Sequence, residues 1–417
     1  MGWKKNLALI ALGRLVSILG SSIQAVAIPL LVLDLTHSGS IMAKMALFYM
    51  IPRIIIMPFA GLIGDRVNRK HLMVWMDYLR GILVIILAYI AYKDLLSIRI
   101  LYLSQVFMAI MDNLFMIPTG AMIPDIVPKE QLTRANSIMG MINFIPQLIG
   151  PAAGGVLYGF YGIKIIFLIN GLSFLISGFS EMFIEYHQSA LKGALTLKKV
   201  VSEIKEGLMF VWSHSILRMI VLGAMTINVF LSPMFQVLYP YTLREVVKFS
   251  PQQFGYLESI FIVGALMGNA LLATFFAKRD VSKIMKGSLV FVLFLVPIFG
   301  VLTLPGTLSR FNTWEMFMFF SVLLVLMGFL VQFVDVPIEV IFQRETPTEI
   351  RGRAFSILML MAQGTMPIGI AMYGALLDMM AIHKIYFLGG GILTVIGILL
   401  IAFFPDIPAP EEESSSQ

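Results

Sequence analysis

Four charged side chains lie inside long apolar segments of this chain, where they could pair, bind ions or exchange protons: Arg14, Asp77, Arg80 and Asp112. An apolar run of about 20 residues is long enough to cross a bilayer, and a charge at its centre costs about 2.5–3.5 kcal/mol on insertion scales. Counted from one side of the predicted spans, the four residues lie at similar depth, roughly 8–13 Å at 1.5 Å rise per residue. Two cations and two anions are therefore expected at one level.

The surroundings of these charges suggest different roles. Asp77 and Arg80 are three residues apart and can pair on one helix face, so we interpret them as a structural ion pair. Arg53 has no acid on its own segment and must find a partner, a watery cavity or an anionic substrate group. Glu258 is the most plausible protonatable acid of the second half, although it could also stay ionised in an outer vestibule. Gln24 offers neutral hydrogen bonds, either to cargo or to a neighbouring helix.

A second charged cluster occupies the segment GLIGDRVNRK at 61–70. Its glycines can allow close packing against a neighbouring helix. Its acid could lie near a helix amino-terminus, and Asn68 suits a backbone with positive φ. The basic residues can hold the loop on one side of a membrane and pair with acids elsewhere. The candidate residues are Gly61, Gly64, Asp65, Arg66, Arg69 and Lys70.

Long helices must position these residues, because the chain is 59% hydrophobic and only 13% charged, with a mean hydropathy of +0.89. Soluble domains contain about 25% charged residues. We predict an all-α membrane protein with twelve transmembrane helices. The predicted spans are 7–33, 41–63, 72–92, 99–117, 136–159, 164–185, 216–240, 253–277, 285–304, 314–336, 354–380 and 385–404.

The basic residues are distributed unevenly between the loops. If the amino-terminus is cytoplasmic, eighteen Lys and Arg residues fall in cytoplasmic segments and seven in outer loops. This asymmetry is the positive-inside bias of membrane proteins. It predicts a plasma-membrane protein with both termini in the cytoplasm, and it explains the pI of 9.3 without nucleic acid as a partner.

Several kinds of chemistry lack a sequence signal. The chain has no cysteine, no phosphate-binding G-x-x-x-x-G-K-[ST] loop and no pattern typical of a nucleophile elbow. The five histidines are scattered near the ends of predicted spans. We therefore expect no metal, no cofactor and no enzymatic activity.

The two halves of the chain repeat each other. A shift of 219 residues aligns 118–137 with 337–356, with six identical pairs, and the match continues into the next apolar segment. A shift of 213 aligns 61–70 with the loop that contains Arg279 and Lys283. We predict two pseudo-symmetric six-helix bundles. The predicted domains are 1–185, a linker with an amphipathic helix at 186–215, a second bundle at 216–404 and a disordered acidic tail at 405–417.

These features resemble a known family. The segment 61–70 is similar to the Gly-x-Leu-Ala-Asp-Arg-x-Gly-Arg-Arg/Lys signature of the major facilitator superfamily, and 17–38, 51–81 and 123–137 resemble its branch of macrolide-efflux proteins and enterobactin exporters. The resemblance implies the major facilitator fold and a conformational latch at 61–70. A simple topology anchor is the alternative. In the second copy Lys278 replaces Asp65, so that copy should keep only the anchor.

Two further details bear on the resemblance. Gly150-Pro151-Ala-Ala-Gly154-Gly155 is similar to a superfamily pattern that marks exporters, although small-residue packing explains it too. The arginine motif of proton-coupled drug antiporters is missing from 101–115. Transport could therefore be coupled through a different protonation site or to a different ion.

The resemblance implies a monomeric secondary exporter that moves a bulky amphipathic molecule, such as a macrolide-like drug or a siderophore, across the lipid bilayer in exchange for protons. On helices that line the cavity in this fold, Arg14 and Asp112 are candidates for substrate or coupling contacts, with Gln24, Arg53 and Glu258. One alternative keeps the fold but moves lysophospholipid or imports a solute. Another is a receptor or scaffold that transports nothing.

Overall fold

The computed structural model describes residues 2–186, 197–276 and 281–403, and this part of the chain is helical without a strand. The helices of the first half are α1 (Gly2–Thr36), α2 (Gly39–Arg66), α3 (Arg69–Tyr92), α4 (Ile98–Ile126), η1 (Lys129–Gln131) and α5 (Leu132–Glu181). Those that follow are α6 (Leu197–Ser213), α7 (Ser215–Phe230), η2 (Met234–Leu238), α8 (Tyr239–Tyr241), η3 (Thr242–Val246), α9 (Pro251–Leu271), η4 (Leu272–Phe276), α10 (Val281–Leu302), α11 (Pro305–Arg310), α12 (Thr313–Arg344), α13 (Arg351–Met379) and α14 (Ile382–Phe403).

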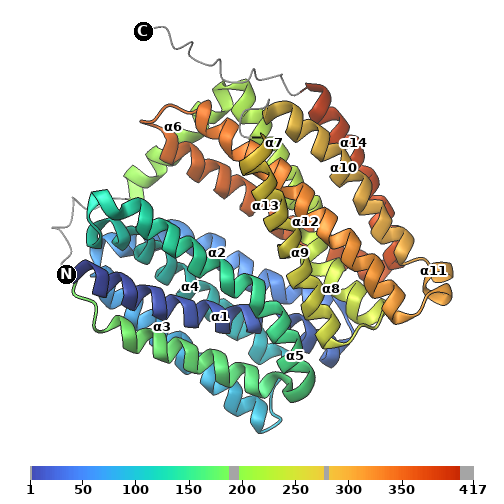
Figure 1. The fold of residues 1–417 in the computed structure, drawn as a ribbon, viewed down its shortest axis with the longest axis horizontal. Helices are drawn as coiled ribbons and strands as arrows, with labels where there is room; N and C mark the ends of the chain where they lie inside the picture. Colours follow the sequence, from blue (N-terminus) through green and yellow to red (C-terminus); the bar gives the residue numbers. More distant parts are fainter. Residues whose placement is uncertain (1, 187–196, 277–280, 404–417) are drawn as a thin grey trace. The chain divides into compact units, whose positions relative to one another are not determined.

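The described residues form two compact units (Figure 1). Unit 1 consists of the described residues of 1–200 and 249–259, and unit 2 consists of those of 201–248 and 260–417. The first part of α9 therefore belongs to unit 1 and the rest of α9 to unit 2.

Eleven helical segments in the described part of the chain are long and apolar enough to cross a membrane. One of them contains α5, whose 50 residues would measure about 75 Å as one straight helix, more than twice the hydrocarbon thickness. Gly162 divides α5, because its φ of 67° and ψ of −168° fall in a region that only glycine adopts readily. The limbs 132–161 and 163–181 both pack on α1, so the chain reverses at Gly162 and α5 supplies two spans. The twelve predicted spans are thus present.

Several helices extend beyond the predicted spans. The helix α4 continues to Ile126 and α12 to Arg344, past the predicted ends at 117 and 336. Hydropathy marks only the part of a helix that lies in hydrocarbon, whereas the backbone hydrogen bonds continue into the interface. One prediction was too long, because the second limb of α5 ends at Glu181, before the predicted end at 185. The predicted span 216–240 lies within the helical segment Ser215–Val246, whose α-helical pattern is interrupted at Leu231.

Small residues allow the helices of unit 1 to pack closely. A Cβ added at Gly20 of α1 would lie 2.6 Å from Asn170 Oδ1 of α5, and one added at Gly13 would lie 2.8 Å from Ser180 Oγ. A Cβ at Gly81 of α3 would meet Leu175 of α5 at 2.6 Å. The second limb of α5 therefore packs tightly against both α1 and α3, and this packing positions the charged residues described below.

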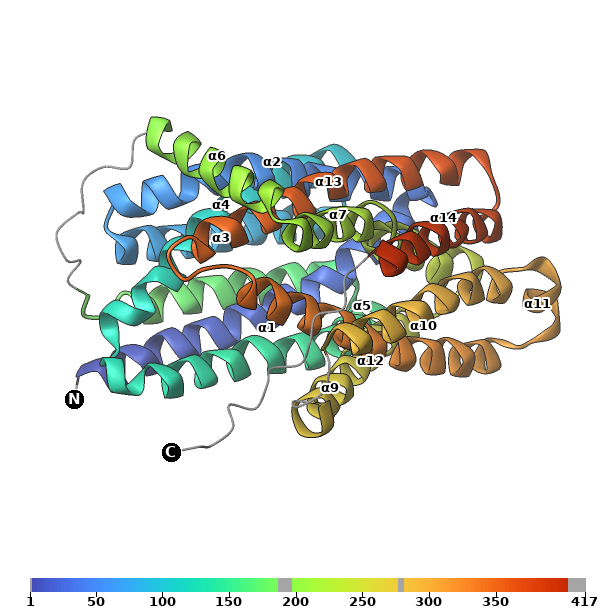
Figure 2. The same ribbon diagram turned by 90° about the horizontal axis from the view of Figure 1, so that it is seen from above.

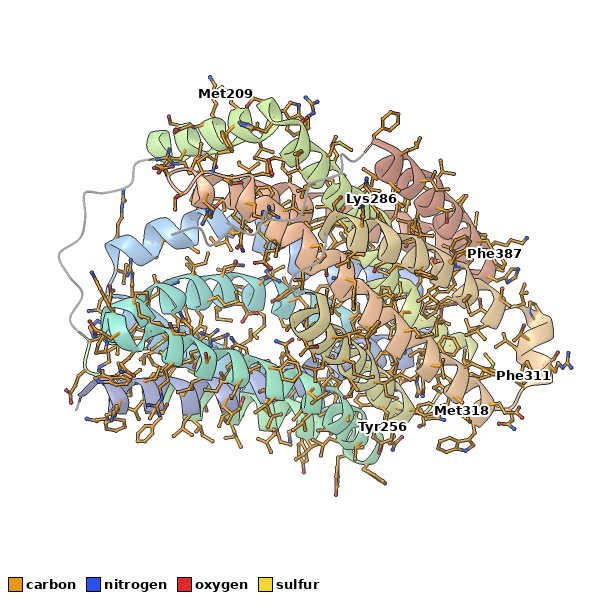
Figure 3. All side chains as sticks on the ribbon, turned by 45° about the horizontal axis from the view of Figure 1, so that its top comes forward. Met209, Tyr256, Lys286, Phe311, Met318 and Phe387 are labelled. Atoms are coloured by element: carbon orange, nitrogen blue, oxygen red, sulfur yellow. The ribbon has the colours of Figure 1, made fainter. Side chains whose placement is uncertain are left out.

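The helix pairs of unit 2 repeat those of unit 1. The pairs α10–α12 and α10–α14, which lie close together in Figure 2, correspond to α3–α4 and to α3 with the second limb of α5. On the surface, large apolar side chains such as Met318 and Phe387 point outward (Figure 3). Exposed apolar side chains over so many helices suit a lipid-facing surface.

The helix α6 occupies most of the predicted linker. Its Glu206 pairs with Arg353 at the start of α13, with 2.8 Å between Oε2 and Nη1. The position of α6 along a membrane surface, and the predicted domain limits, stay predictions, and the predicted tail at 405–417 lies outside the described residues.

Candidate functional site

A cluster of charged side chains lies inside unit 1, with Arg80 of α3 at its centre. Arg80 Nη1 donates to Asp112 Oδ1 of α4 at 3.0 Å, and Arg80 Nη2 pairs with Asp77 Oδ1 one turn away on α3. The guanidinium also lies between two aromatic rings, 4.1 Å from the centroid of Phe115 and 4.6 Å from that of Phe174. Arg80 thus joins α3, α4 and α5 through charge and through cation–π contact.

Sequence reasoning missed a fifth charged residue of this cluster, Glu181. It is the last residue of α5 and has no exposed surface. It interacts electrostatically with Asp77, Arg80 and Arg14, and it accepts a hydrogen bond from Ser177 Oγ at 3.3 Å. The sequence could have indicated it, because Glu181 lies four residues before the end of the predicted span 164–185. That position is close to the depth predicted for the other four charges.

The cluster is only partly satisfied by hydrogen bonds. Among the described residues, four of its buried polar atoms have no hydrogen-bond partner: Arg14 Nε, Asp77 Oδ2, Arg80 Nε and Glu181 Oε2. A buried polar atom without a partner costs about 1–3 kcal/mol. Unsatisfied buried groups are rare in folded proteins, and a functional role is one of their explanations.

Asp112 is the more accessible acid that Arg80 contacts. The side chain of Asp112 is 24% exposed, whereas that of Asp77 is fully buried. Tyr49 of α2 donates to Asp112 Oδ2 at 2.9 Å. One turn further along α2, the half-buried Arg53 accepts a hydrogen bond at its backbone carbonyl from Asn113 at 3.4 Å. Tyr49 and Arg53 therefore flank the partly exposed side of the cluster.

The remaining candidates for substrate or coupling contacts lie apart from this network. Gln24 is buried and accepts a hydrogen bond from Asn170 Nδ2 at 2.7 Å, which is a helix–helix contact between α1 and α5. Glu258 is half-buried on the first part of α9. No group of three or more histidine and acidic residues in the described chain is arranged to hold a metal ion.

The structure corrects three expectations about the segment 61–70. Asn68 has a φ of −59° and caps α3, accepting from His71 N at 3.2 Å, so no positive φ occurs there. Asp65 lies in the last turn of α2 rather than at a helix amino-terminus, and its side chain is outside the described residues. A Cβ at Gly64 would meet Pro118 of α4 at 2.9 Å, whereas Gly61 faces open space, so only Gly64 is required for close packing.

Arg69 pairs within its own unit. Its Nη1 donates to Asp125 Oδ2 of α4 at 3.1 Å, and Tyr186 donates to the same oxygen at 2.8 Å. Partial burial and the neighbouring Asp125 carboxylate raise the pKa of Tyr186 to about 12, so its hydroxyl remains a donor at physiological pH. These three residues tie the start of α3, the end of α4 and the chain after α5 together. Arg66 is exposed at the end of α2.

The Gly-Pro-x-x-Gly-Gly pattern lies where the first limb of α5 crosses two helices. Gly150 and Gly154 pack against Ser22 and Ile23 of α1. Gly155 faces Gly255 at the start of α9, and a Cβ added at either glycine would lie 3.0 Å from the Cα of the other. Each of the three glycines is therefore required by a close backbone approach. Pro151 lies between them in the same helix.

Unit 2 contains an apolar groove between α7, α10, α12 and α14. Its lining includes Met219, Met285, Leu289 and Leu400, and Lys286 is its charged member. Aliphatic and Met side chains of this kind suit a flexible apolar ligand.

Twelve spans in two repeated sets of six, with buried charges inside one set, define a multi-pass membrane transporter of the major facilitator type. The family model of the MFS_3 transmembrane secretion effectors matches residues 4–417, and this chain belongs to that family. The proteins of the family are transporters, and we therefore describe the chain as a transporter and not as an enzyme.

Similar proteins cover nearly the whole chain. It is 23% identical over 398 residues to macrolide efflux protein A of Streptococcus pyogenes, and the match covers 95% of each chain. It is 24% identical over 415 residues to the multidrug efflux pump Tap of Mycolicibacterium fortuitum, which covers 96% of this chain and 95% of Tap. The fold is similar to that of a bacterial homologue of the iron transporter ferroportin in its inward-facing state, with a TM-score of 0.71 and 17% identity over 95% of this chain and 98% of the other.

Proposed function

We propose that this protein exports a bulky amphipathic small molecule, of the macrolide or multidrug type, in exchange for protons. The observation that carries the proposal is the similarity over 95% of the chain to macrolide efflux protein A. The apolar groove of unit 2 and the partly exposed Asp112 are consistent with a cargo that is mainly apolar and carries a polar group.

The proposed cycle is alternating access, in which the binding site for cargo opens first to one side of the membrane and then to the other. Asp112, Arg53 and Glu258 are the proposed contacts for cargo or for the coupling ion, because each is a charged residue within a span that retains some exposure. The segment 61–70 is the proposed latch that stabilises one of the two states. We further propose that the transporter works as a monomer.

Transport of a labelled macrolide, erythromycin, tests this function. Everted membrane vesicles that contain the protein should accumulate erythromycin when their interior is acidified. Collapse of the pH gradient with nigericin should release it. Vesicles that contain the protein but accumulate no more erythromycin than vesicles without it would contradict export, and accumulation that ignores nigericin would contradict proton exchange.

We propose that the protein resides in the plasma membrane with both termini in the cytoplasm. The chain has no cysteine, so single cysteines can report on sidedness. Lys164 follows the reversal at Gly162, and Lys129 lies on the short helix between α4 and α5. In intact cells a membrane-impermeant maleimide should label Lys164→Cys, and it should label Lys129→Cys only after permeabilisation. The opposite result would invert the topology.

A further inference from the structure

The charges of the buried cluster in unit 1 do not cancel. Its buried charged side chains are Asp77 and Glu181, with two negative charges when ionised, and Arg80, with one positive charge. Arg14, Arg53 and Asp112 are half-buried at its edge. Asp77 and Glu181 are fully buried, and Arg80 is 6% exposed. A net charge in such an environment is costly, and the simplest way to remove it is to bind one proton.

The hydrogen bonds indicate where that proton belongs. Asp112 Oδ1 and Oδ2 have donors in Arg80 and Tyr49, so both of its oxygens are satisfied. Asp77 Oδ2 and Glu181 Oε2 are buried acceptors without a donor, and Ser177 lies beside both carboxyl groups. A protonated carboxyl group donates a hydrogen bond as well as accepting one. One proton on either Asp77 or Glu181 therefore supplies a donor for the unpaired oxygen of the other residue.

We propose that Asp77 and Glu181 share one exchangeable proton, and that this carboxyl pair is the proton-coupling site of the transporter. The second part of this statement rests on the proposed function, whereas the first part does not. Neither residue needs a cofactor or a second ion for the step, which is the binding or release of a single proton.

The surrounding groups can transmit a change in protonation to the partly exposed side of the cluster. Arg80 contacts Asp77 on one side and Asp112 on the other, and Arg14 of α1 interacts with Glu181. Loss of the proton adds a negative charge that attracts both guanidiniums. Arg80 would then pair more closely with Asp77 and less with Asp112, which would free Asp112 for cargo. Tyr49 and Arg53 are the polar groups that α2 presents there.

Infrared spectroscopy of the purified protein in lipid tests the shared proton without any substrate. The wild type should show a protonated carboxylic acid band that shifts in D₂O and loses intensity as the pH is raised. Glu181→Gln should abolish this band, and Glu181→Asp should retain a band at a shifted frequency. The matched control is Glu185→Gln, which removes an exposed carboxyl that pairs with Lys5 and should leave the band intact. A wild type without the band, or a band that persists in Glu181→Gln, would overturn the site.

Transport of erythromycin in proteoliposomes tests the coupling. At one proton exchanged per molecule, a gradient of one pH unit drives about tenfold accumulation. Glu181→Gln should lose this accumulation and still exchange labelled for unlabelled erythromycin at equilibrium. Full accumulation by Glu181→Gln would overturn the coupling role. If the wild type moves no erythromycin while the infrared band behaves as expected, the proposed function fails and the proton site stands.

Discussion

Arg80 on α3 donates to Asp112 on α4 with 3.0 Å between Nη1 and Oδ1, and this bond joins two helices inside unit 1. The same guanidinium pairs with Asp77 on its own helix. The fully buried Asp77 and the partly exposed Asp112 therefore share one cation. This dependence makes Arg80 the residue whose loss should affect the unit most.

Arg80→Gln should destabilise the protein by about 3–5 kcal/mol, because it leaves the buried Asp77 carboxylate without its cationic partner. Thermal unfolding in detergent measures the change. Lys164→Gln is the control, since it breaks an exposed ion pair with Asp94 whose contribution is about 0–1 kcal/mol. Equal unfolding temperatures for the two variants would show that the Arg80 contacts contribute little.

Gly155→Ala should destabilise the crossing of α5 with α9 by about 1–3 kcal/mol, because the new methyl group would lie 3.0 Å from the Cα of Gly255. The control lies in the same helix. Gly140 has open space around it, so Gly140→Ala should be neutral or slightly stabilising through helix propensity. Thermal unfolding and erythromycin transport should both separate the two variants. If the two variants have the same unfolding temperature and transport rate, the close approach of Gly155 to Gly255 contributes to neither stability nor transport.

Substitution of Gly162 tests backbone strain separately from steric clash, because a Cβ added there would meet no atom within 4 Å. Both Gly162→Ala and Gly162→Asn should lower stability by about 1–3 kcal/mol, since a φ of 67° with a ψ of −168° suits glycine alone. Asparagine tolerates the ordinary left-handed region but not this one. Wild-type stability of Gly162→Asn in thermal unfolding would mean that the reversal has ordinary left-handed geometry.

Tyr186→Phe should destabilise the protein by about 0.5–1.5 kcal/mol at pH 7, because Asp125 loses one donor. The pKa of Tyr186 is raised to about 12 in the folded protein, from about 10 in an unfolded chain. The stability that the protonated hydroxyl contributes is therefore complete below pH 10 and is lost as the pH rises towards 12.

The difference in unfolding temperature between wild type and Tyr186→Phe should accordingly stay constant from pH 6 to 9 and shrink above pH 10. The exposed Tyr161 provides the control, and Tyr161→Phe should leave stability at pH 7 unchanged. A difference that grows with pH would contradict the proposed hydrogen bond.

Asp65→Asn should reduce erythromycin transport while the amount of protein in the membrane and its unfolding temperature stay near those of the wild type. The reason is that a latch stabilises one state of the cycle, whereas a topology anchor requires only the basic residues. Asp94→Asn removes the same charge at an exposed turn whose φ of 56° asparagine tolerates, and it should transport normally. Full activity of Asp65→Asn would favour the anchor.

Hydropathy alone predicted the helices and their number. A backbone in hydrocarbon must satisfy its own hydrogen bonds, so an apolar run such as 314–336 has little choice but to form a helix. The same reasoning located the reversal between 159 and 164, where Gly162 divides α5. Hydropathy could not locate helix ends in the interface, as the extension of α4 to Ile126 illustrates.

The sequence by itself thus determined the class of fold, the repeat and the approximate depth of Arg14, Asp77, Arg80 and Asp112. Only the tertiary structure decided which side chains meet. Glu181 joins the cluster because the glycines and serines of α1 and α5 bring the end of α5 beside Asp77, and Arg69 pairs with Asp125 because α4 continues past its apolar core. The apolar composition of one segment predicts that it forms a helix in lipid. The partner of a buried charge depends instead on how several helices are rotated and aligned against one another.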